Sequence, residues 1–309
     1  NLVLGLLEQP DLPVRDIALN SERQVGDLLS LSKGPVAALE PHTVPDLILR
    51  RCAEAPSAIA VNDGREAATY GDLGERINRL TRALRQRGIG PGDTVAIEMP
   101  RSVGLVVSTV AVLNSGAAYL HLETDLPTER RAAMLDQAAP SAIMTREFVE
   151  AEWPPDEGVR RNPPLPPATA ARSDDSHQPP RAAYVVFTSG STGTPKGVVG
   201  THLGLLNFLS AMGRVTGLTP RDRVLSISGL SFDAVAREML LPLASGAALY
   251  FVSDYEPGNA EQVAQAVVEL EINVVLAGTP SYLTQIGLEL ARRGSSLSLT
   301  VSAGESIRK

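Results

Sequence analysis

The sequence predicts an α/β protein, and three features of the chain support this class. Short apolar segments alternate with longer segments whose apolar residues recur at helical spacing, a pattern typical of parallel sheets covered by helices. The chain has 309 residues, a length that favours two domains over one. Hydrophobic residues make up 43% and charged residues 20%, which are ordinary values for a globular protein.

The pattern divides the chain into three parts. Residues 1–42 mix an apolar start with polar stretches, and we expect a linker that packs on a neighbour at a few hydrophobic points. Residues 43–182 are predicted to form a first α/β lobe, which closes with a connector at 154–180 that is rich in proline. Residues 183–309 are predicted to form a second lobe. The chain stops without a closing element, so we expect a truncated domain.

The first lobe is predicted to alternate helix and strand. Leu73, Ile77, Leu80 and Leu84 recur at helical spacing before a group of glycines. Ser102 is predicted to cap the next, strongly apolar helix. The predicted helices are 44–56, 69–93, 102–116 and 127–139, and the predicted strands are 58–61, 94–99, 117–122 and 141–145.

The second lobe repeats this alternation with short strands and amphipathic helices. The predicted strands are 182–190, 222–228, 247–252, 272–278 and 298–304, and the predicted helices are 201–217, 232–246, 260–271 and 280–294.

Composition excludes several classes of function. The net charge of -7 argues against a protein dominated by nucleic-acid contacts. No apolar run reaches the roughly 20 residues of a membrane span, so we expect no membrane segment. Cys52 is the one cysteine, which fits a cytoplasmic protein, and we interpret it as a packed, unreactive thiol. The histidines and Cys52 show no metal-ligand spacing, so no metal site is predicted.

The most informative segment is "TSGSTGTPKG", residues 188–197, which follows an apolar strand and precedes a helix starting near His202. Its three glycines let the backbone approach a ligand and point N–H groups at it. Five hydroxyl side chains add donors, and Lys196 adds a compact positive charge. Together these groups suit a polyphosphate. A flexible surface loop is the alternative that composition alone leaves open.

Two common nucleotide motifs do not fit this loop. A Walker loop closes with Gly-Lys-Ser/Thr, whereas here Pro195 precedes Lys196 and Gly197 follows it. The dinucleotide pattern G-x-G-x-x-G is also absent. A different kind of phosphate-binding loop is therefore indicated.

The segment 184–202, "YVVFTSGSTGTPKGVVGTH", resembles the phosphate loop of the adenylate-forming enzymes, which include acyl-CoA synthetases, luciferases and the adenylation domains of nonribosomal peptide synthetases. Further segments are similar to motifs of the peptide-synthetase branch, and residues 2–24 look like the linker that follows a condensation domain. The resemblance covers nearly the whole chain and implies two parallel-sheet lobes of the large N-terminal domain, truncated before its end. The other matching segments are 68–97, 112–140, 232–249 and 301–306.

The resemblance implies a role for each matching residue of the loop. In the family the loop contacts the β- and γ-phosphates of ATP and the departing pyrophosphate, and donors aimed at that developing charge lower the barrier. Lys196 and Thr188 are the expected catalytic residues. The expected ATP-binding residues of the loop are Thr188, Ser189, Gly190, Ser191, Thr192, Gly193 and Lys196.

Asp233 is the second expected site residue. In amino-acid-activating members the Asp of the "FD" pair binds the substrate's α-ammonium group, and a carboxylate in a partly buried pocket is satisfied by such a cation. An Asp at the start of a helix is also a common N-cap, which is the competing interpretation of Asp233. Acyl-CoA synthetases have no amine to bind, so this residue separates the two branches.

The resemblance also implies a side-chain pocket and an adenine contact. Gly304 and Glu305 are expected near the adenine. Arg237 stands where the family often has tryptophan, and it either favours an acidic or acceptor-rich substrate or turns outward to solvent. The pocket-lining residues expected by correspondence are Ala234, Arg237, Ala277, Val301 and Ala303.

Two further residues depart from the family pattern. His121 stands where the second motif usually has proline, and we expect it to change packing and not to act as a catalytic histidine. Val235 stands where serine or threonine is common.

The function that the resemblance implies is activation of an amino acid as its aminoacyl-AMP, followed by loading onto a carrier domain. The implied cofactors are ATP, Mg²⁺ with a ligand expected beyond residue 309, and phosphopantetheine on the carrier. The implied partners are an upstream condensation domain, a downstream peptidyl carrier domain and an MbtH-like protein. Because later family elements lie beyond Lys309, the isolated chain is expected to be inactive. A stand-alone acyl- or aryl-CoA ligase and a degenerate scaffold module are the alternatives.

Overall fold

The structure is a computed structural model in which the chain divides into two units, residues 1–40 and 41–309. In the first unit the described residues form one helix, α2 (Glu22–Ser32), whose side chains Val25, Leu28, Leu29 and Leu31 are exposed. Its expected packing on a neighbour stays a prediction. The proline-rich connector lies outside the described residues. The structure describes residues 21–32, 43–152, 181–188, 195–253 and 255–305.

The second unit contains two sheets. The five-stranded sheet is parallel except for its last pair, β6 and β7, which run antiparallel. In spatial order its strands are β5 (Ala142–Thr145), β3 (Thr94–Glu98), β4 (Ala118–Leu122), β6 (Ala182–Thr188) and β7 (Lys196–Thr201).

The six-stranded sheet is likewise parallel apart from one edge pair, β1 and β2. In spatial order its strands are β11 (Leu299–Thr300), β10 (Val274–Val275), β8 (Arg223–Leu225), β9 (Ala248–Tyr250), β1 (Ile59–Asn62) and β2 (Ala67–Thr69). The predicted α/β class is therefore confirmed, with an antiparallel edge on each sheet.

The strands do not divide between the sheets where the predicted lobes divide. β1 and β2 come early in the chain, yet they extend the six-stranded sheet through the pair β1 and β9. β6 and β7 follow the connector, yet they extend the five-stranded sheet through Tyr184 opposite Tyr119. A boundary at residue 182 therefore separates β6 from the sheet to which it belongs, and the predicted limits of the lobes stay untested as domain limits.

Every helix predicted from periodicity is present, with shorter ends than predicted in several cases. Four elements were missed: the helix α2, the strands β2 and β7, and the short helix α7. The helices of the second unit are α3 (Val44–Glu54), α4 (Tyr70–Gln86), α5 (Val103–Ser115), α6 (Thr128–Ala138), α7 (Arg146–Glu152), α8 (His202–Thr216), α9 (Ala234–Ser245), α10 (Ala260–Glu269) and α11 (Pro280–Arg292).

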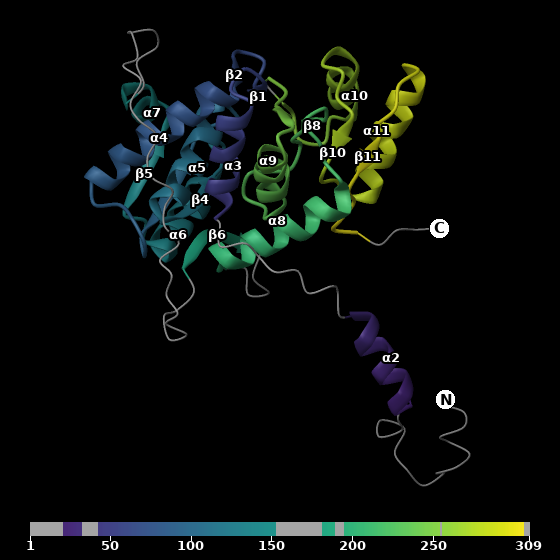
Figure 1. Ribbon diagram of the computed structural model, residues 1–309, viewed down its shortest axis with the longest axis horizontal. Coiled ribbons are helices and arrows are strands. Elements are labelled where there is room, and N and C mark those ends of the chain that lie inside the picture. The colour runs from purple at the N-terminus through teal and green to yellow at the C-terminus, as the bar shows by residue number, and fades with distance from the viewer. Residues whose placement is uncertain (1–20, 33–42, 153–180, 189–194, 254, 306–309) are drawn as a thin grey trace. The chain divides into compact units, whose positions relative to one another are not determined.

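A layer of helices joins the two sheets (Figure 1). α5 packs against β3 and β4, α9 packs against β8 and β9, and α3 contacts both helices. The Tyr70 hydroxyl, at the start of α4, donates to the carbonyl oxygens of Leu243 and Ala247 at 3.2 and 2.8 Å. These contacts tie the end of α9 to the N-terminal part of the unit.

Local sequence signals set the ends of these helices. Ser102 caps α5 as predicted, because its Oγ accepts a hydrogen bond from Leu105 N at 3.2 Å. Thr43 and Asp46 form a reciprocal capping box at the start of α3. Gly116 ends α5 in the left-handed conformation, with φ of 95°.

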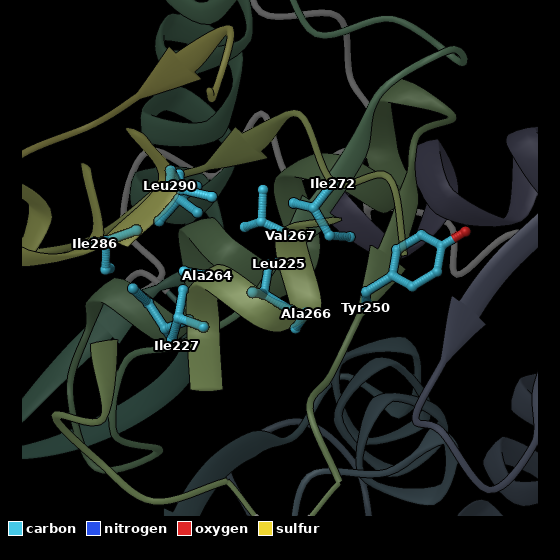
Figure 2. Close-up of a cluster of buried hydrophobic side chains, with 11 residues drawn as sticks. Leu225, Ile227, Tyr250, Ala264, Ala266, Val267, Ile272, Ile286 and Leu290 are labelled. Carbon is cyan, nitrogen blue, oxygen red and sulfur yellow. The ribbon is translucent and has the colours of Figure 1, made fainter. Parts of the chain in front are cut away.

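The far face of the six-stranded sheet is covered by α10 and α11. Figure 2 shows the buried cluster that joins them to β8, β9 and β10, including Leu225, Val267, Ile286 and Leu290. All four side chains are at most 2% exposed. Burial of this apolar surface fixes the carboxyl ends of the strands, from which the candidate site is built.

Candidate active site

The loop singled out in the sequence joins β6 to β7, and its two ends meet. Thr188 and Lys196 are Cα partners in the antiparallel register of these strands, so their side chains lie on the same face of the sheet. Both residues are exposed. The other five loop residues with predicted phosphate contacts lie outside the described residues, namely Ser189, Gly190, Ser191, Thr192 and Gly193.

The backbone on either side of Lys196 is held by one side chain that the sequence analysis missed. Gln137, at the end of α6, donates from Nε2 to the carbonyl oxygen of Pro195 at 2.9 Å. Its Oε1 accepts from the N–H of Gly197 at 3.2 Å. The primary amide therefore brackets Lys196 and fixes the point at which the loop returns to the sheet. No sequence signal distinguishes this glutamine from other polar residues on α6.

Asp233 directly precedes α9 and does not behave as a helix cap. Its backbone is αR, with φ of -63° and ψ of -26°, and its side chain makes no capping hydrogen bond. The carboxylate is exposed and lies at the wall of a cavity. The capping interpretation is therefore wrong for this helix, and the carboxylate stays available to a ligand.

The cavity lies where the strands β4 and β6 diverge. These strands pair at one position, Tyr119 opposite Tyr184, and residues beyond that point on both strands line the space. The turn before α9 closes it. The lining residues are Tyr119, Leu120, His121, Met134, Val185, Val186, Phe187, Leu230, Ser231, Phe232, Asp233 and Val235.

His121 forms part of this wall as a packed, neutral side chain. It is 3% exposed, its Nε2 lies 2.8 Å from Thr109 Oγ1, and its ring centroid lies 4.5 Å from that of Tyr119. Burial lowers the pKa of His121 to about 3, so the ring is uncharged at neutral pH. The expected packing role is confirmed.

Arg237 does not turn outward to solvent. Its side chain is buried on α9, with 9% of the residue exposed, and its Nε lacks a hydrogen-bond partner among the described residues. Burial lowers the pKa of the guanidinium, while Glu238 and Asp233 oppose that shift. Arg237 does not line the cavity at Asp233.

The other expected pocket residues gather at the carboxyl ends of β10 and β11. Ala277 is buried just beyond β10, and Val301 donates its N–H to Val275 O at 3.0 Å. Ala303 donates its N–H to Gly278 O at 3.0 Å. Ala234 is the first residue of α9, the helix that follows strand β8 of the same sheet. These residues thus share one edge of the six-stranded sheet, the usual place for ligands in parallel α/β folds.

Gly304 and Glu305 follow at the same edge. Gly304 adopts φ of +92°, a left-handed conformation that favours glycine. The Glu305 carboxylate accepts a hydrogen bond from Ser281 N at 3.3 Å, in the first turn of α11. This contact ties the end of β11 to α11. Their expected role at the adenine is untested.

Glu238, in the second turn of α9, is a further residue of the site that the sequence analysis missed. It is fully buried and accepts three hydrogen bonds from the segment that follows β8. Burial raises the pKa of this carboxyl group, and the hydrogen bonds and Arg101 oppose the shift. The one sequence signal that could have drawn attention to Glu238 is its position as an acidic residue inside the apolar run of a helix.

The described residues contain neither a metal-binding cluster nor a membrane-spanning helix. No cluster of three or more His, Cys, Asp or Glu side chains in that part of the chain has the arrangement of a metal site. None of the helices described there combines the length and the apolar character needed to cross a membrane.

Comparison with known proteins identifies the class. The family model described as "AMP-binding enzyme" matches residues 48–309. The match includes both sheets, the loop between β6 and β7, and Asp233. The chain therefore belongs to the AMP-binding enzyme family.

Individual relatives are nonribosomal peptide synthetases. The chain is 37% identical over 82% of its length to a probable non-canonical nonribosomal peptide synthetase, CymA of Salinispora arenicola, and covers 3% of that protein. It is 35% identical to a dimodular nonribosomal peptide synthase of Bacillus subtilis, over 77% of this chain and 10% of that protein. It is 34% identical to enterobactin synthase component F of Escherichia coli, over 80% of this chain and 19% of that protein.

Solved structures agree with the sequence relatives. The crystal structure of the nonribosomal peptide synthetase FmoA3 superposes with a TM-score of 0.76 and 26% identity, covering 99% of this chain and 34% of that chain. Its AMPPNP-bound form gives the same values. Its form bound to alpha-methyl-L-serine-AMP gives a TM-score of 0.72 and 25% identity over 93% of this chain and 33% of that chain. The chain thus spans a minor part of each of these proteins.

Proposed function

We propose that this chain is the larger part of an adenylation domain that activates an amino acid with ATP inside a nonribosomal peptide synthetase. The substrate carboxylate attacks the α-phosphorus of ATP, a new P–O bond forms, and the bond to the β-phosphate breaks to release pyrophosphate. The product is an aminoacyl-AMP.

Each described residue has a distinct task in this proposal. Lys196 and Thr188 meet the departing pyrophosphate at the mouth of the loop, where positive charge and a hydroxyl donor stabilise the developing negative charge. Asp233 receives the α-ammonium group of the substrate. Gly304 and Glu305 border the adenine. Ala234, Arg237, Ala277, Val301 and Ala303 surround the side chain, and buried Arg237 favours one that accepts hydrogen bonds.

One observation carries this proposal furthest: Lys196 lies opposite Thr188 at the base of the loop, and Gln137 holds the backbone on both sides of it. A lysine placed in this way projects from a fixed point, whereas a lysine in an irregular surface loop does not. Pre-organisation of this kind is what charge stabilisation in a transition state requires.

The expected cofactors and partners belong to the same proposal. Mg²⁺ accompanies the ATP, and its ligand is expected beyond residue 309. The aminoacyl group passes to phosphopantetheine on a downstream carrier domain, and a condensation domain precedes residues 1–42. An MbtH-like protein as helper and a cytoplasmic location complete the proposal.

Two alternative functions predict different experimental results. A stand-alone acyl- or aryl-CoA ligase would activate acids that lack an α-amine, although exposed Asp233 then has no cation to bind. A degenerate scaffold module would show no magnesium-dependent affinity for ATP.

The test is amino-acid-dependent exchange of pyrophosphate into ATP by the full-length protein that contains this chain, measured across the amino acids. We expect exchange with one amino acid or a few similar ones, and a fall of about a hundredfold or more in Lys196→Ala, as for loss of one key transition-state donor. Arg214→Ala, which removes an exposed cation from α8, is the matched control and should exchange normally. Absence of exchange with every amino acid, or an unaffected Lys196→Ala variant, would contradict the proposal.

A further inference from the structure

We infer that Glu238 is a positioning residue for Asp233: it fixes the segment Ser226–Asp233 to helix α9, so that the Asp233 carboxylate faces the substrate ammonium group. This inference rests on the proposed function and adds a residue to which nothing in the sequence assigned a role.

Asp233 cannot fix its own position. It makes no capping hydrogen bond with α9, and its side chain is exposed at the wall of the cavity. Its carboxylate is therefore placed by the backbone of the segment that leads into it. That segment begins where β8 ends and contains Leu230, Ser231 and Phe232, which also line the cavity.

Glu238 holds the beginning of this segment through both of its carboxylate oxygens. Oε2 accepts from Ser226 Oγ at 3.0 Å and from Ser228 N at 3.0 Å, and Oε1 accepts from Ile227 N at 3.1 Å. Three donors from three consecutive residues thus converge on one carboxylate. Such contacts restrict the direction of the backbone as well as its distance from the helix.

The segment is consequently held at both ends by the same helix. Its last residue, Asp233, continues directly into α9, and its first residues are bonded to Glu238 in the second turn of α9. A turn inside the segment, with Phe232 N donating to Gly229 O at 3.2 Å, shortens the path between the two ends.

A second charged side chain, which is partly buried, supports the same segment from the end of a strand in the other sheet. Arg101, which follows β3, donates from Nη2 to Ser228 O, and its guanidinium lies 5.3 Å from the ring centroid of Tyr255. Ser228 is thereby held at its N–H by Glu238 and at its carbonyl by Arg101. The carboxylate and the guanidinium attract each other electrostatically.

The energetics favour positioning over bulk stability as the role of this carboxylate. Burying a charge costs several kcal/mol, and an apolar side chain of similar size stabilises a core at least as well. What the charged group supplies is directional acceptance of three hydrogen bonds, which an apolar side chain cannot provide. That directionality is useful where a neighbouring side chain must keep a defined orientation.

The test uses the full-length protein and pyrophosphate exchange with its amino acid and with the α-hydroxy acid of the same side chain. Glu238→Gln keeps the shape but replaces one acceptor oxygen with an NH₂ group, so it loses at least one bond to the segment. We expect the KM for the amino acid to rise about tenfold, and the preference for the amino acid over the hydroxy acid to fall by a similar factor. The KM for ATP should stay within about twofold, because the loop at Lys196 is untouched.

Two further variants make the result decisive. Glu54→Gln, the same change on the exposed side of α3, should leave all these values unchanged. Ser226→Ala removes one donor to Glu238 and should shift KM and preference in the same direction by a smaller factor; it decides the question if Glu238→Gln does not fold.

A folded variant with unchanged KM and preference overturns the inference. A fall in kcat alone, with both KM values and the preference intact, overturns it as well, because that is the result of a purely structural role. Failure of the wild-type protein to exchange with any amino acid overturns the proposed function, and this inference with it.

Discussion

At the scale of single residues, Asp233 and Asp46 look alike in the sequence but make different contacts in the structure. Both are acidic residues at the start of a helix. Asp46 completes the capping box of α3, with Oδ2 accepting from Thr43 N at 2.8 Å. Asp233 makes no such bond on α9. The difference predicts that the two carboxylates contribute to different properties of the protein.

Asp233→Ala is expected to change the free energy of unfolding by less than about 0.5 kcal/mol, because no capping bond is lost. The same variant should lower amino-acid-dependent exchange by at least about tenfold, since it removes the partner of the ammonium group. Urea unfolding and pyrophosphate exchange, measured on the same preparation, check both parts.

Asp46→Ala is the matched control, and its expected pattern is the reverse. It should cost about 1 kcal/mol of stability through loss of the capping box and leave exchange unchanged. Equal losses of stability in the two variants would contradict this expectation and would indicate that Asp233 caps α9.

At this scale the environment of Cys52 was predictable, whereas the roles expected for the loop and pocket residues stay predictions. The interpretation of Cys52 as a packed thiol is confirmed, because it is 7% exposed and burial raises its pKa to about 12. The contacts of Gln137 and Glu238 were not predictable, because their partners are 58 and 60 residues away for Gln137 and 10 to 12 for Glu238. Nothing in the local sequence specifies which groups such a side chain contacts.

At the scale of elements, helix α6 connects the five-stranded sheet to the loop. Its Arg131 donates from Nε and Nη2 to the two oxygens of Glu98 on β3, both at 2.7 Å. Its other end carries Gln137, which holds the backbone around Lys196. Loss of the tie to β3 should therefore loosen the helix that supports the loop.

Glu98→Gln is expected to lower stability by about 1 kcal/mol at pH 7, a value limited by the partial exposure of both partners. The hydrogen bonds from Arg131 lower the pKa of Glu98 below its ordinary 4.5. The contribution of the pair is thus present above that ordinary value and is lost as the pH falls through the lowered one. Urea unfolding at pH 7 and pH 3 should show the wild-type advantage shrinking in acid.

Glu261→Gln provides the comparison for this prediction. Its contact with Arg293 is 3.5 Å long and the Glu261 side chain is 76% exposed, so this substitution should change the free energy of unfolding little. A Glu98→Gln deficit that persists undiminished in acid would contradict an electrostatic origin.

Helices and strands were predictable where the apolar pattern is long, and their prediction failed where the pattern is short or weak. Helix α4 carries several turns of consistent apolar spacing and α5 is a long, almost wholly apolar segment, and the positions of both are confirmed. β7 was missed because its residues are mostly exposed and include two glycines, Gly197 and Gly200. Gly200 is required there, because a Cβ would lie 2.2 Å from the ring of Tyr184 on β6.

At the scale of the whole second unit, each sheet contains strands from both of the predicted lobes. β1 and β2 complete the six-stranded sheet, and β6 and β7 complete the five-stranded one. Neither predicted lobe therefore contains all the strands of its own sheet, and we expect residues 43–309 to fold cooperatively.

The corresponding experiment cuts the chain at the predicted boundary. Residues 43–182 lack β9 beside β1 and β6 beside β4, so this half should show no cooperative thermal transition. Residues 183–309 lack β1 beside β9 and β4 beside β6, and they should likewise show no cooperative transition. Circular dichroism melting of each half, with residues 43–309 as the control, measures this; a half that melts cooperatively alone would contradict the expectation.

The sequence by itself determined the α/β class, most of the elements and the family, and it singled out the loop at 188–197, because each depends on residues that are contiguous or a few positions apart. The tertiary structure alone decided which sheet each strand joins and that Thr188 faces Lys196 across β6 and β7. It also decided that Arg237 is buried and that Glu238 holds the segment before Asp233. These properties depend on which distant surfaces bury each other, and that choice follows from the free energy of the whole packed unit.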